Sequence, residues 1–256
     1  MRIPRTIRTI TERLARGRSI TRRLPAEFGR RRICISPDAS LRYLLPGQRA
    51  FDSFLSMIAR RLVKPGMQVW DIGSNIGQFM ATAAGKAGSE GKVLAAEPDP
   101  WLIKLLEQTR KMPLPNEAPI ELAAVAISSE SGSAQLNVAR RGRASSWIGD
   151  GPGGSQSGGS RGTQTVPTSS LDDLLRKHFP PDLVKIDIEG AEHDALRGAR
   201  ALLEEVRPII VIEVSEKNRD GVTTTLQDLG YSLHDAENPD FPDIPACSFN
   251  TLARPK

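Results

Sequence analysis

Apolar residues occur along this chain in two patterns that alternate from residue 51 onwards. Short apolar runs predict buried strands, and stretches in which every third or fourth residue is apolar predict helices. The predicted strands cover 69–72, 92–96, 121–127, 133–139, 183–188 and 208–214, with a strand pair from 231 onwards. The predicted helices cover 51–63, 78–86, 100–112, 171–177, 189 to about 205, and 222–229. Such alternation predicts an α/β fold with a doubly wound, mainly parallel sheet.

A glycine turn, Gly-Ser-Asn-Ile-Gly at 73–77, follows the first of these strands and leads into a helix. A helix start of this kind offers free backbone N–H groups and a positive dipole end to a ligand. Asp71 can receive a positively charged ligand group. Glu97 ends the next strand, 24 residues after Gly73, a distance at which an acidic side chain bonds ribose hydroxyls. The predicted nucleoside-binding residues are Asp71, Gly73, Ser74, Asn75, Gly77 and Glu97.

The spacing of the glycines bears on which nucleoside binds. A dinucleotide site uses G-x-G-x-x-G, in which the second glycine lets the backbone approach a pyrophosphate. Asn75 stands at that position here. S-adenosylmethionine has no pyrophosphate, and its ammonium and sulfonium groups suit Asp71. The turn therefore favours S-adenosylmethionine over NAD or FAD.

Composition narrows the class of protein. With 256 residues, 39% of them apolar and 25% charged, the chain fits one large globular domain or a domain plus an extension. No run of about 18 apolar residues predicts a membrane-spanning helix. Cys34 and Cys247 form neither a metal-binding pattern nor a disulfide framework, which indicates a reducing, cytoplasmic location.

Positive charge is concentrated at the N-terminus. Residues 1–32 contain eleven arginines against Glu12 and Glu27, a net charge of +9, so the other 224 residues carry −4. We expect a basic arm and connector over 1–50 and a domain over 51–256. Apolar residues at helical spacing in the arm leave three interpretations open: contact with anionic lipid at a membrane periphery or with nucleic acid, an organelle transit peptide, or a solvated or partly packed helix.

Residues 142–162 contain eight glycines and five serines. A run of this composition buries little surface, so we expect a mobile loop. Such a loop either closes over a site as a lid or has no role. Trp147 within it is a candidate for stacking on a substrate ring.

A second group of acidic residues follows the strand predicted at 183–188. In open α/β sheets ligands bind beyond the carboxyl ends of the strands, near the point where the strand order reverses. Asp187 would lie there if its strand neighbours the strand at 69–72, and Glu213 ends the following strand at the same edge. Glu189 and Glu192 are three residues apart, which places them together in a first helical turn.

These segments resemble the FkbM-type methyltransferases in order and spacing. The matching segments are Val-Trp-Asp-Ile-Gly-Ser-Asn-Ile-Gly from 69, Ala-Ala-Glu-Pro-Asp from 95, Ser-Leu-Asp-Asp-Leu from 170, Val-Lys-Ile-Asp-Ile-Glu-Gly-Ala-Glu-His-Asp-Ala-Leu-Arg-Gly from 184, and Arg-Pro-Ile-Ile-Val-Ile-Glu from 207. The resemblance covers roughly residues 51–233. It implies a Rossmann-like, seven-stranded sheet of the class I methyltransferase type, whose last strand is antiparallel.

The resemblance also implies methyl transfer from S-adenosylmethionine to a hydroxyl of a sugar, glycan or natural product. By the same resemblance the nucleoside-binding residues above hold this cofactor, and the backbone at 124–126, including Ala126, flanks adenine. A hydroxyl nucleophile needs a base or a cation that stabilises the forming alkoxide. Asp187 is the candidate base, or it forms a magnesium or manganese site with Glu213 or Glu189. These three are the candidate catalytic residues.

The alternative is an enzyme that methylates RNA or another nucleic acid. Its supports are the basic arm and Trp147, whereas the acidic domain speaks against it. The Asn/Asp-Pro-Pro-aromatic motif of enzymes that methylate amide or nucleobase nitrogens is absent, which also favours an oxygen acceptor. His193, next to Glu192, is a further candidate base.

Overall fold

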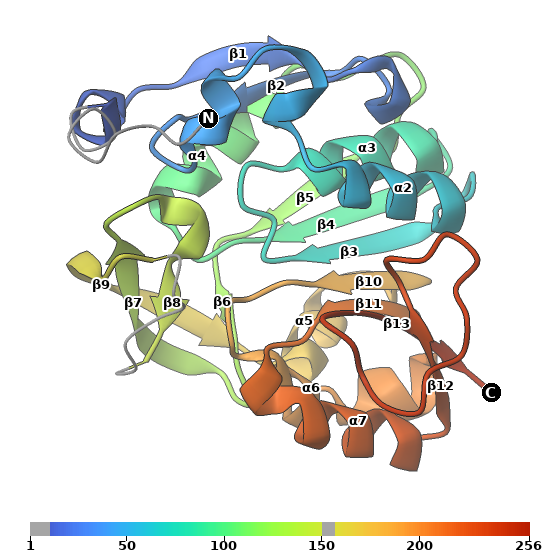
Figure 1. Cartoon of the computed structure of the whole chain (residues 1–256). Coiled ribbons are helices and arrows are strands. Elements are labelled where there is room, and N and C mark those ends of the chain that lie inside the picture. Colours follow the sequence, from blue (N-terminus) through green and yellow to red (C-terminus); the bar gives the residue numbers. More distant parts are fainter. Residues whose placement is uncertain (1–10, 150–156) are drawn as a thin grey trace.

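The computed structural model describes residues 11–149 and 157–256, and its centre is a seven-stranded sheet (Figure 1). The strand order is β12-β13-β11-β10-β3-β4-β5. Five neighbouring strands are parallel, whereas β13 is antiparallel to both β11 and β12. This confirms the predicted Rossmann-like, doubly wound sheet. The strands are β3 (Gln68–Ile72), β4 (Lys92–Ala96), β5 (Ile120–Ala123), β10 (Leu183–Ile186), β11 (Ile209–Glu213), β12 (Tyr231–Asp235) and β13 (Asn250–Pro255).

Helices cover both faces of the sheet, because successive residues of its buried strands point to opposite sides. Trp70 and Ile72 pack with α5, α6 and α7, whereas Val69 packs with α2 and α3. Asp52 and Asp99 cap the N-termini of α2 and α4 through their side chains. The helices are α2 (Ser53–Leu62), α3 (Gln78–Ala87), α4 (Pro100–Arg110), α5 (Leu171–Lys177), α6 (Glu192–Arg197) and α7 (Arg219–Asp228). Within the described ranges, no helix has the length and apolar content needed to cross a membrane.

A second sheet of four strands, in the order β6-β9-β7-β8, stands beside the first. Its strands are β6 (Ala126–Ile127), β7 (Gly132–Ala139), β8 (Trp147–Ile148) and β9 (Ser160–Ser169), with a 3-10 turn η4 (Arg143–Ser145) before β8. The strand predicted at 121–127 is therefore two strands in two sheets. The prediction of a mobile loop at 142–162 is wrong for most of this range, because β7 forms backbone pairs with β8 and β9. Residues 150–156 lie outside the described part.

The N-terminal segment folds onto the domain rather than standing apart from it. A ribbon of β1 (Ile20–Arg23) and β2 (Arg32–Ile35) packs on α4, and Ile33, Ile35 and Phe51 share one apolar cluster with Leu102 and Leu105. The apolar packing thus continues across residue 50, where we expected a boundary between arm and domain. The turns of this segment are η1 (Ala26–Phe28), η2 (Leu41–Leu44) and η3 (Gly47–Ala50). Three of the arm's apolar residues, Ile3, Ile7 and Ile10, lie outside the described residues.

The helix predicted from 189 to about 205 is interrupted. Helix α6 spans only 192–197, and a separate π-helical turn, η5 (Leu202–Val206), follows it. Gly198 lies between them, where an added Cβ would come within 2.7 Å of the Ser129 carbonyl oxygen. The chain breaks here because it must pass closely under the segment that leads to β7. A 3-10 turn, η6 (Glu216–Asn218), precedes α7.

Candidate active site

The glycine turn after β3 lies directly against the end of β10. Gly73 has φ +73°, and a Cβ at this position would lie 1.8 Å from the carbonyl oxygen of Asp187. The Asp187 N–H donates to the Ile72 carbonyl at 3.1 Å, so the two strand ends are bonded to each other. Only glycine meets both requirements without strain. This contact brings the two acidic segments predicted from the sequence to one edge of the sheet.

Asp71 lies beneath this turn and is fully buried. Its carboxylate accepts hydrogen bonds from the Ser74 hydroxyl at 2.8 Å and the Met80 N–H at 3.0 Å. The Lys185 ammonium lies 3.2 Å from its other oxygen. We expected Asp71 to receive a positive group of the ligand, but the positive group that it meets is Lys185. Asp71 and Ser74 therefore support the turn from below.

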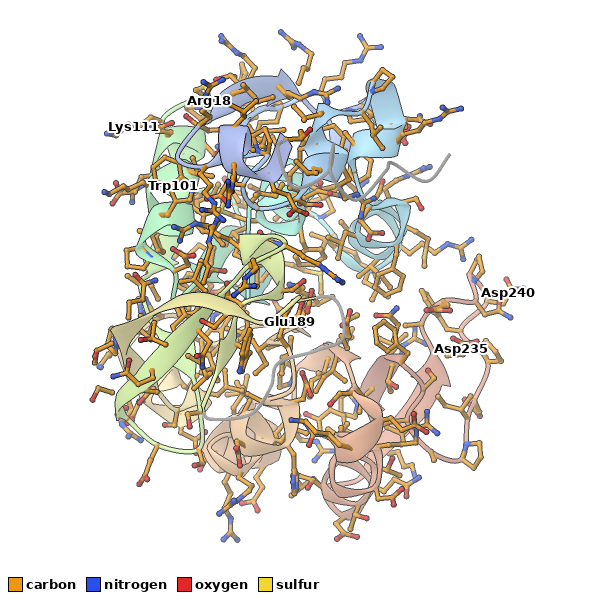
Figure 2. The ribbon with its side chains drawn as sticks, turned by 60° about the vertical axis from the view of Figure 1, so that its left-hand side comes forward. Arg18, Trp101, Lys111, Glu189, Asp235 and Asp240 are labelled. Carbon is orange, nitrogen blue, oxygen red and sulfur yellow. The ribbon has the colours of Figure 1, made fainter. Side chains whose placement is uncertain are left out.

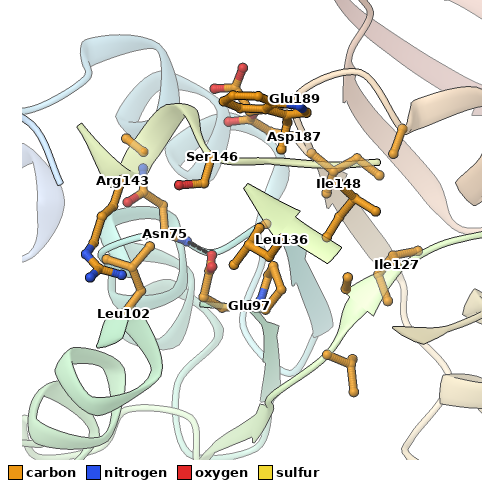
Figure 3. Close-up of a pocket in the computed structure, with 18 residues that line it drawn as sticks. Asn75, Glu97, Leu102, Ile127, Leu136, Arg143, Ser146, Ile148, Asp187 and Glu189 are labelled. Carbon is orange, nitrogen blue, oxygen red and sulfur yellow. Dashed lines mark hydrogen bonds between the residues drawn. The ribbon is translucent and has the colours of Figure 1, made fainter. Parts of the chain in front are cut away.

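Glu97 ends β4 and faces the cavity beside the turn (Figure 3). Its two oxygens accept hydrogen bonds from the Asn75 N–H and the Asp99 N–H, each at 2.9 Å. Burial raises its pKa to about 7. A carboxylate has about four lone-pair sites, so Glu97 keeps acceptor capacity for ribose hydroxyls while it holds the turn.

The cavity between the two sheets has a polar end and an apolar slot. Leu102 and Leu136 belong to the slot, together with residues 125–127, which overlap the segment 124–126 that was expected to flank adenine. Trp147 is buried in its wall. Gly77 does not line this cavity: an added Cβ there would meet Leu106 and Met80 in the core. The lining consists of Gly73, Asn75, Glu97, Pro98, Leu102, Val125, Ala126, Ile127, Leu136, Arg143, Ala144, Ser146, Trp147, Ile148, Asp187, Ile188, Glu189 and Ala191.

Arg143 fastens the second sheet over this cavity. Its guanidinium contacts the Asp38 carboxylate at 3.0 Å and the Asp99 carboxylate at 2.6 Å. Arg161 adds a two-fold contact to Asp38, at 2.7 and 2.9 Å. These cations hold the pKa of Asp38 below its usual value against the opposing effect of burial. One ion-pair network thus joins the N-terminal segment, the second sheet with its turn η4, and the start of helix α4.

Asp187, Glu189 and Glu213 lie near one another at the rim of the sheet. Partial desolvation, together with the neighbouring carboxylates, raises the pKa of Asp187, that of Glu189 to about 7 and that of Glu213 to about 8. Asp187 and Glu213 are half-buried and Glu189 is exposed, so the shift of Glu189 is the least supported by its surroundings. Lys185 opposes these shifts, with its ammonium 3.7 Å from the Asp187 carboxylate. Although burial lowers the pKa of Lys185, Asp71 and Asp187 raise it by more, so the ammonium stays charged.

Asp187 is the residue at which the cavities of this edge meet. Besides the slot already described, it lines two neighbouring cavities. The second is lined by Asp52, Phe54, Leu55, Lys185, Ile186, Asp187, Val211, Glu213, Glu237, Phe249 and Asn250. The third is lined by Ser40, Arg42, Tyr43, Asp52, Leu55, Gly73, Ser74, Asn75, Ile76, Gln78, Phe79, Ala144, Lys185 and Asp187.

The remaining acidic residue of this segment, Glu192, has a structural role. Glu189 precedes α6 with φ +52°, so it does not share a first helical turn with Glu192 as predicted. The Glu192 carboxylate accepts bonds from the Gly190 N–H, Ser215 and Asn218 at 2.6–3.1 Å and so closes the loop before α6. Nothing in these contacts connects Glu192 with a ligand.

Neither a metal site nor the histidine candidate gains support. In residues 11–149 and 157–256, no three His, Cys, Asp or Glu side chains are placed to hold a metal ion. Although Asp187, Glu189 and Glu213 lie near one another, they are not placed to hold the magnesium or manganese ion that was expected there. The His193 ring packs at Gly221 of α7, away from the cavity lining.

Several residues of the site were not predicted from the sequence. Lys185 precedes Asp187 by two positions in one strand, and this spacing places both side chains on the same face, a signal that was available. Arg143 and Asp38 carry no such signal, because they contact each other across 105 positions of the chain.

The Rossmann-like sheet, with the glycine turn after β3 held by Glu97, has the architecture expected of a methyltransferase domain. The sequence profile described as the methyltransferase FkbM domain matches residues 71–233, which is more than half of the chain. The chain therefore belongs to the FkbM methyltransferase family.

A curated relative matches part of this chain at low identity. The chain is 29% identical over 149 residues to the hexuronic acid methyltransferase AglP of Haloferax volcanii, a match that covers 56% of this chain and 54% of that protein. The chain thus spans about half the length of this curated relative.

Solved structures match this chain at low identity and with TM-scores below 0.5. Methyltransferase FkbM from Methylobacillus flagellatus is 15% identical with a TM-score of 0.46, over 80% of this chain and 55% of that one. A SAM-dependent O-methyltransferase from Thermotoga maritima is 15% identical with a TM-score of 0.44, over 80% of this chain and 65% of that one.

Proposed function

We propose that this protein methylates a hydroxyl group of a sugar or glycan. The observation that carries the proposal is the position of Asp187, where the slot beside Glu97 meets two further cavities. A group at this junction reaches both a cofactor in the slot and an acceptor in the adjoining space. Its raised pKa makes the carboxylate a stronger base than a free aspartate.

The residues of the slot fit S-adenosylmethionine. The backbone at 125–127 and Leu136 offer apolar surface for adenine, and Glu97 offers oxygens for the ribose hydroxyls. Asp187 complements the positive charge of the sulfonium, and Glu189 that of the ammonium group. When bound, this cofactor supplies an electrophilic methyl carbon on sulfur and leaves as neutral S-adenosylhomocysteine.

The chain's own residues then handle the acceptor proton. Asp187 accepts the proton of the acceptor hydroxyl as the oxygen forms its bond to the methyl carbon. Lys185 lies 3.7 Å behind this carboxylate and 3.2 Å from Asp71, so it fixes the orientation of Asp187. The tight packing of Gly73 on Asp187 positions the base relative to the slot.

The nature of the acceptor is inferred from the adjoining cavities and from the curated relative. Asp52, Glu213 and Glu237 line the second cavity, and carboxylates are good acceptors for sugar hydroxyls. Arg42, whose guanidinium lies 3.5 Å from the Asp52 carboxylate, lines the third cavity, and a guanidinium can pair with a carboxylate. A uronic acid offers both kinds of group, in agreement with the name of the relative from Haloferax volcanii.

The test is a labelled-methyl transfer screen over uronic acids, neutral sugars, lipids and RNA, followed by Asp187→Asn on the acceptor found. We expect transfer to fall about a hundredfold, because a positioned base contributes about 10²–10⁴, while calorimetry finds nearly unchanged affinity for S-adenosylhomocysteine. Asp194→Asn on the exposed face of α6 is the matched control. Full turnover of Asp187→Asn would remove the proposed base, and transfer to RNA alone would establish the rival nucleic-acid activity.

A further inference from the structure

Within the part of the chain that the structure describes, most of the exposed large hydrophobic side chains lie in the N-terminal segment. Among the described residues, the exposed large hydrophobic side chains are Leu14, Ile20, Leu44, Leu45 and Phe249, and four of these five lie between positions 14 and 45. Leu44 and Leu45 are adjacent and are 51% and 45% exposed. Adjacent exposed leucines on a monomer point to a surface that binds something.

The local structure holds these leucines outward. In turn η2 the neighbouring Tyr43 is buried, so its backbone is anchored from inside. Arg22 donates from one guanidinium nitrogen to the carbonyls of Tyr43 and Leu45, at 2.7 and 2.6 Å, and lies over the Phe51 ring at 5.7 Å. Ile20 precedes Arg22 by two positions in β1 and therefore shares its face. Arg22 thus ties the backbone of the two leucines to β1, and Ile20 lies on the Arg22 face of that strand. We call Ile20, Leu44 and Leu45 the leucine edge.

Exposed arginines occur in the same segments as the leucine edge. They are Arg23 and Arg32, which pair across β1 and β2, Arg30 between these strands, and Arg42 and Arg49 in turns η2 and η3. Residues 1–50 contain thirteen arginines against Glu12, Glu27 and Asp38, a net charge of +10, so residues 51–256 carry −5. Asp38 is buried against Arg143 and Arg161 and therefore does not offset the exposed arginines. Figure 2 places Arg18 at the end of the molecule that carries the ribbon, and Asp235 and Asp240 away from it.

We propose that this face docks on the surface of an anionic lipid bilayer. Leu44 and Leu45 would enter the boundary between head groups and acyl chains, and the arginines would meet the lipid phosphates. A nucleic-acid surface would instead pair cations with exposed aromatic rings that stack on bases. The large apolar side chains exposed on this face are aliphatic, and Tyr43 and Phe51 are buried. The face therefore fits lipid better than RNA.

Docking would also orient the active site. Arg42 and Tyr43, directly before Leu44, line the third cavity, which reaches Asp187. The opening for the acceptor thus lies next to the surface that meets the bilayer. The membrane contact does not depend on which acceptor is methylated, and each can be tested without the other.

The experiment is sedimentation of the full chain with vesicles. We expect binding to vesicles of equal parts phosphatidylcholine and phosphatidylglycerol at about 0.15 M salt, and weaker binding at about 1 M salt because the charges are screened. Leu44→Asp/Leu45→Asp should weaken this binding at least about tenfold, because two leucines no longer enter the bilayer. Calorimetry with S-adenosylhomocysteine should give wild-type affinity and so verify the fold of the variant.

The matched control is Thr224→Asp/Gln227→Glu, which adds the same two charges at exposed positions of α7. This variant should bind vesicles as the wild type does. The proposal is overturned if the leucine variant binds vesicles unchanged, or if phosphatidylcholine alone binds equally well. Binding of RNA by the wild type that the leucine variant weakens, without vesicle binding by the wild type, would assign the face to nucleic acid instead.

Discussion

At the scale of single residues, the site depends on one glycine between two strands. Gly73 lets the turn after β3 lie against the Asp187 carbonyl, and its φ of +73° disfavours other residues. Asp71, Lys185 and Asp187 form a chain of alternating charges beneath the turn, with separations of 3.2 and 3.7 Å. The position of the proposed base is therefore set by backbone contact and by ion pairing together.

Gly73→Ala should destabilise the protein by at least about 3 kcal/mol, because its Cβ meets backbone and the residue is held at positive φ. Gly85→Ala is the control: a Cβ there meets nothing within 4 Å, and alanine favours a helix by about 0.5–1 kcal/mol. Urea unfolding of both variants measures the difference. Equal stability of the two would contradict the close packing of β3 on the end of β10.

At the scale of elements, the second sheet closes the cavity because ion pairs fasten it. Arg143 precedes β8 and reaches both Asp38 in the N-terminal segment and Asp99 at the start of α4. Trp147 and Leu136 then form a wall of the slot. The second sheet is thus an ordered part of the proposed cofactor site rather than a loose insertion.

Arg143→Met should weaken binding of S-adenosylhomocysteine about tenfold and lower the free energy of unfolding by about 2 kcal/mol. The reason is that the carboxylate of Asp99, 1% exposed, loses its cation, and removal of one partner from a buried pair is costly. Arg140→Met, at an exposed position of the same hairpin, should change neither. Calorimetry and urea unfolding give the two values. Wild-type affinity of Arg143→Met for S-adenosylhomocysteine would show that the slot keeps its shape without the Arg143 ion pairs.

At the scale of the whole molecule, charge is divided between two regions. The segment 1–50 is strongly basic and the remainder is acidic, and the acidic side chains include a group at the sheet edge whose pKa values are raised. In that group the pKa values are about 7 for Glu97 and Glu189 and about 8 for Glu213. A cationic cofactor would relieve this repulsion.

These values set the sign of a pH dependence. A carboxyl whose folded-state pKa lies above its unfolded value of about 4.5 binds more protons in the native state between those two values. Stability should therefore be greatest near pH 5 and fall as pH rises to about 8. Glu213→Gln should flatten this fall, and Glu130→Gln, an exposed position, should not. Thermal unfolding over this range provides the check, and a curve unaltered by Glu213→Gln would contradict the shifted carboxyl.

Much of the fold was predictable from local pattern. Periodicity predicted the order of strands and helices, and the resemblance to a family supplied the sheet topology. The structure confirmed that β10 lies beside β3, which brings Asp187 to the edge of the glycine turn. Where the prediction failed, as for the loop at 142–162 and the helix to 205, distant segments supplied partners that composition does not reveal.

By itself, the sequence determined the alternation of elements and the family, because these depend on residues close together in the chain. Only the tertiary structure decided that Asp71 lies buried on Lys185, that Arg143 joins three segments, and that the N-terminal segment belongs to the domain. Burial and ion pairing of these residues depend on chain segments far away in the sequence. A local pattern carries no information about such partners.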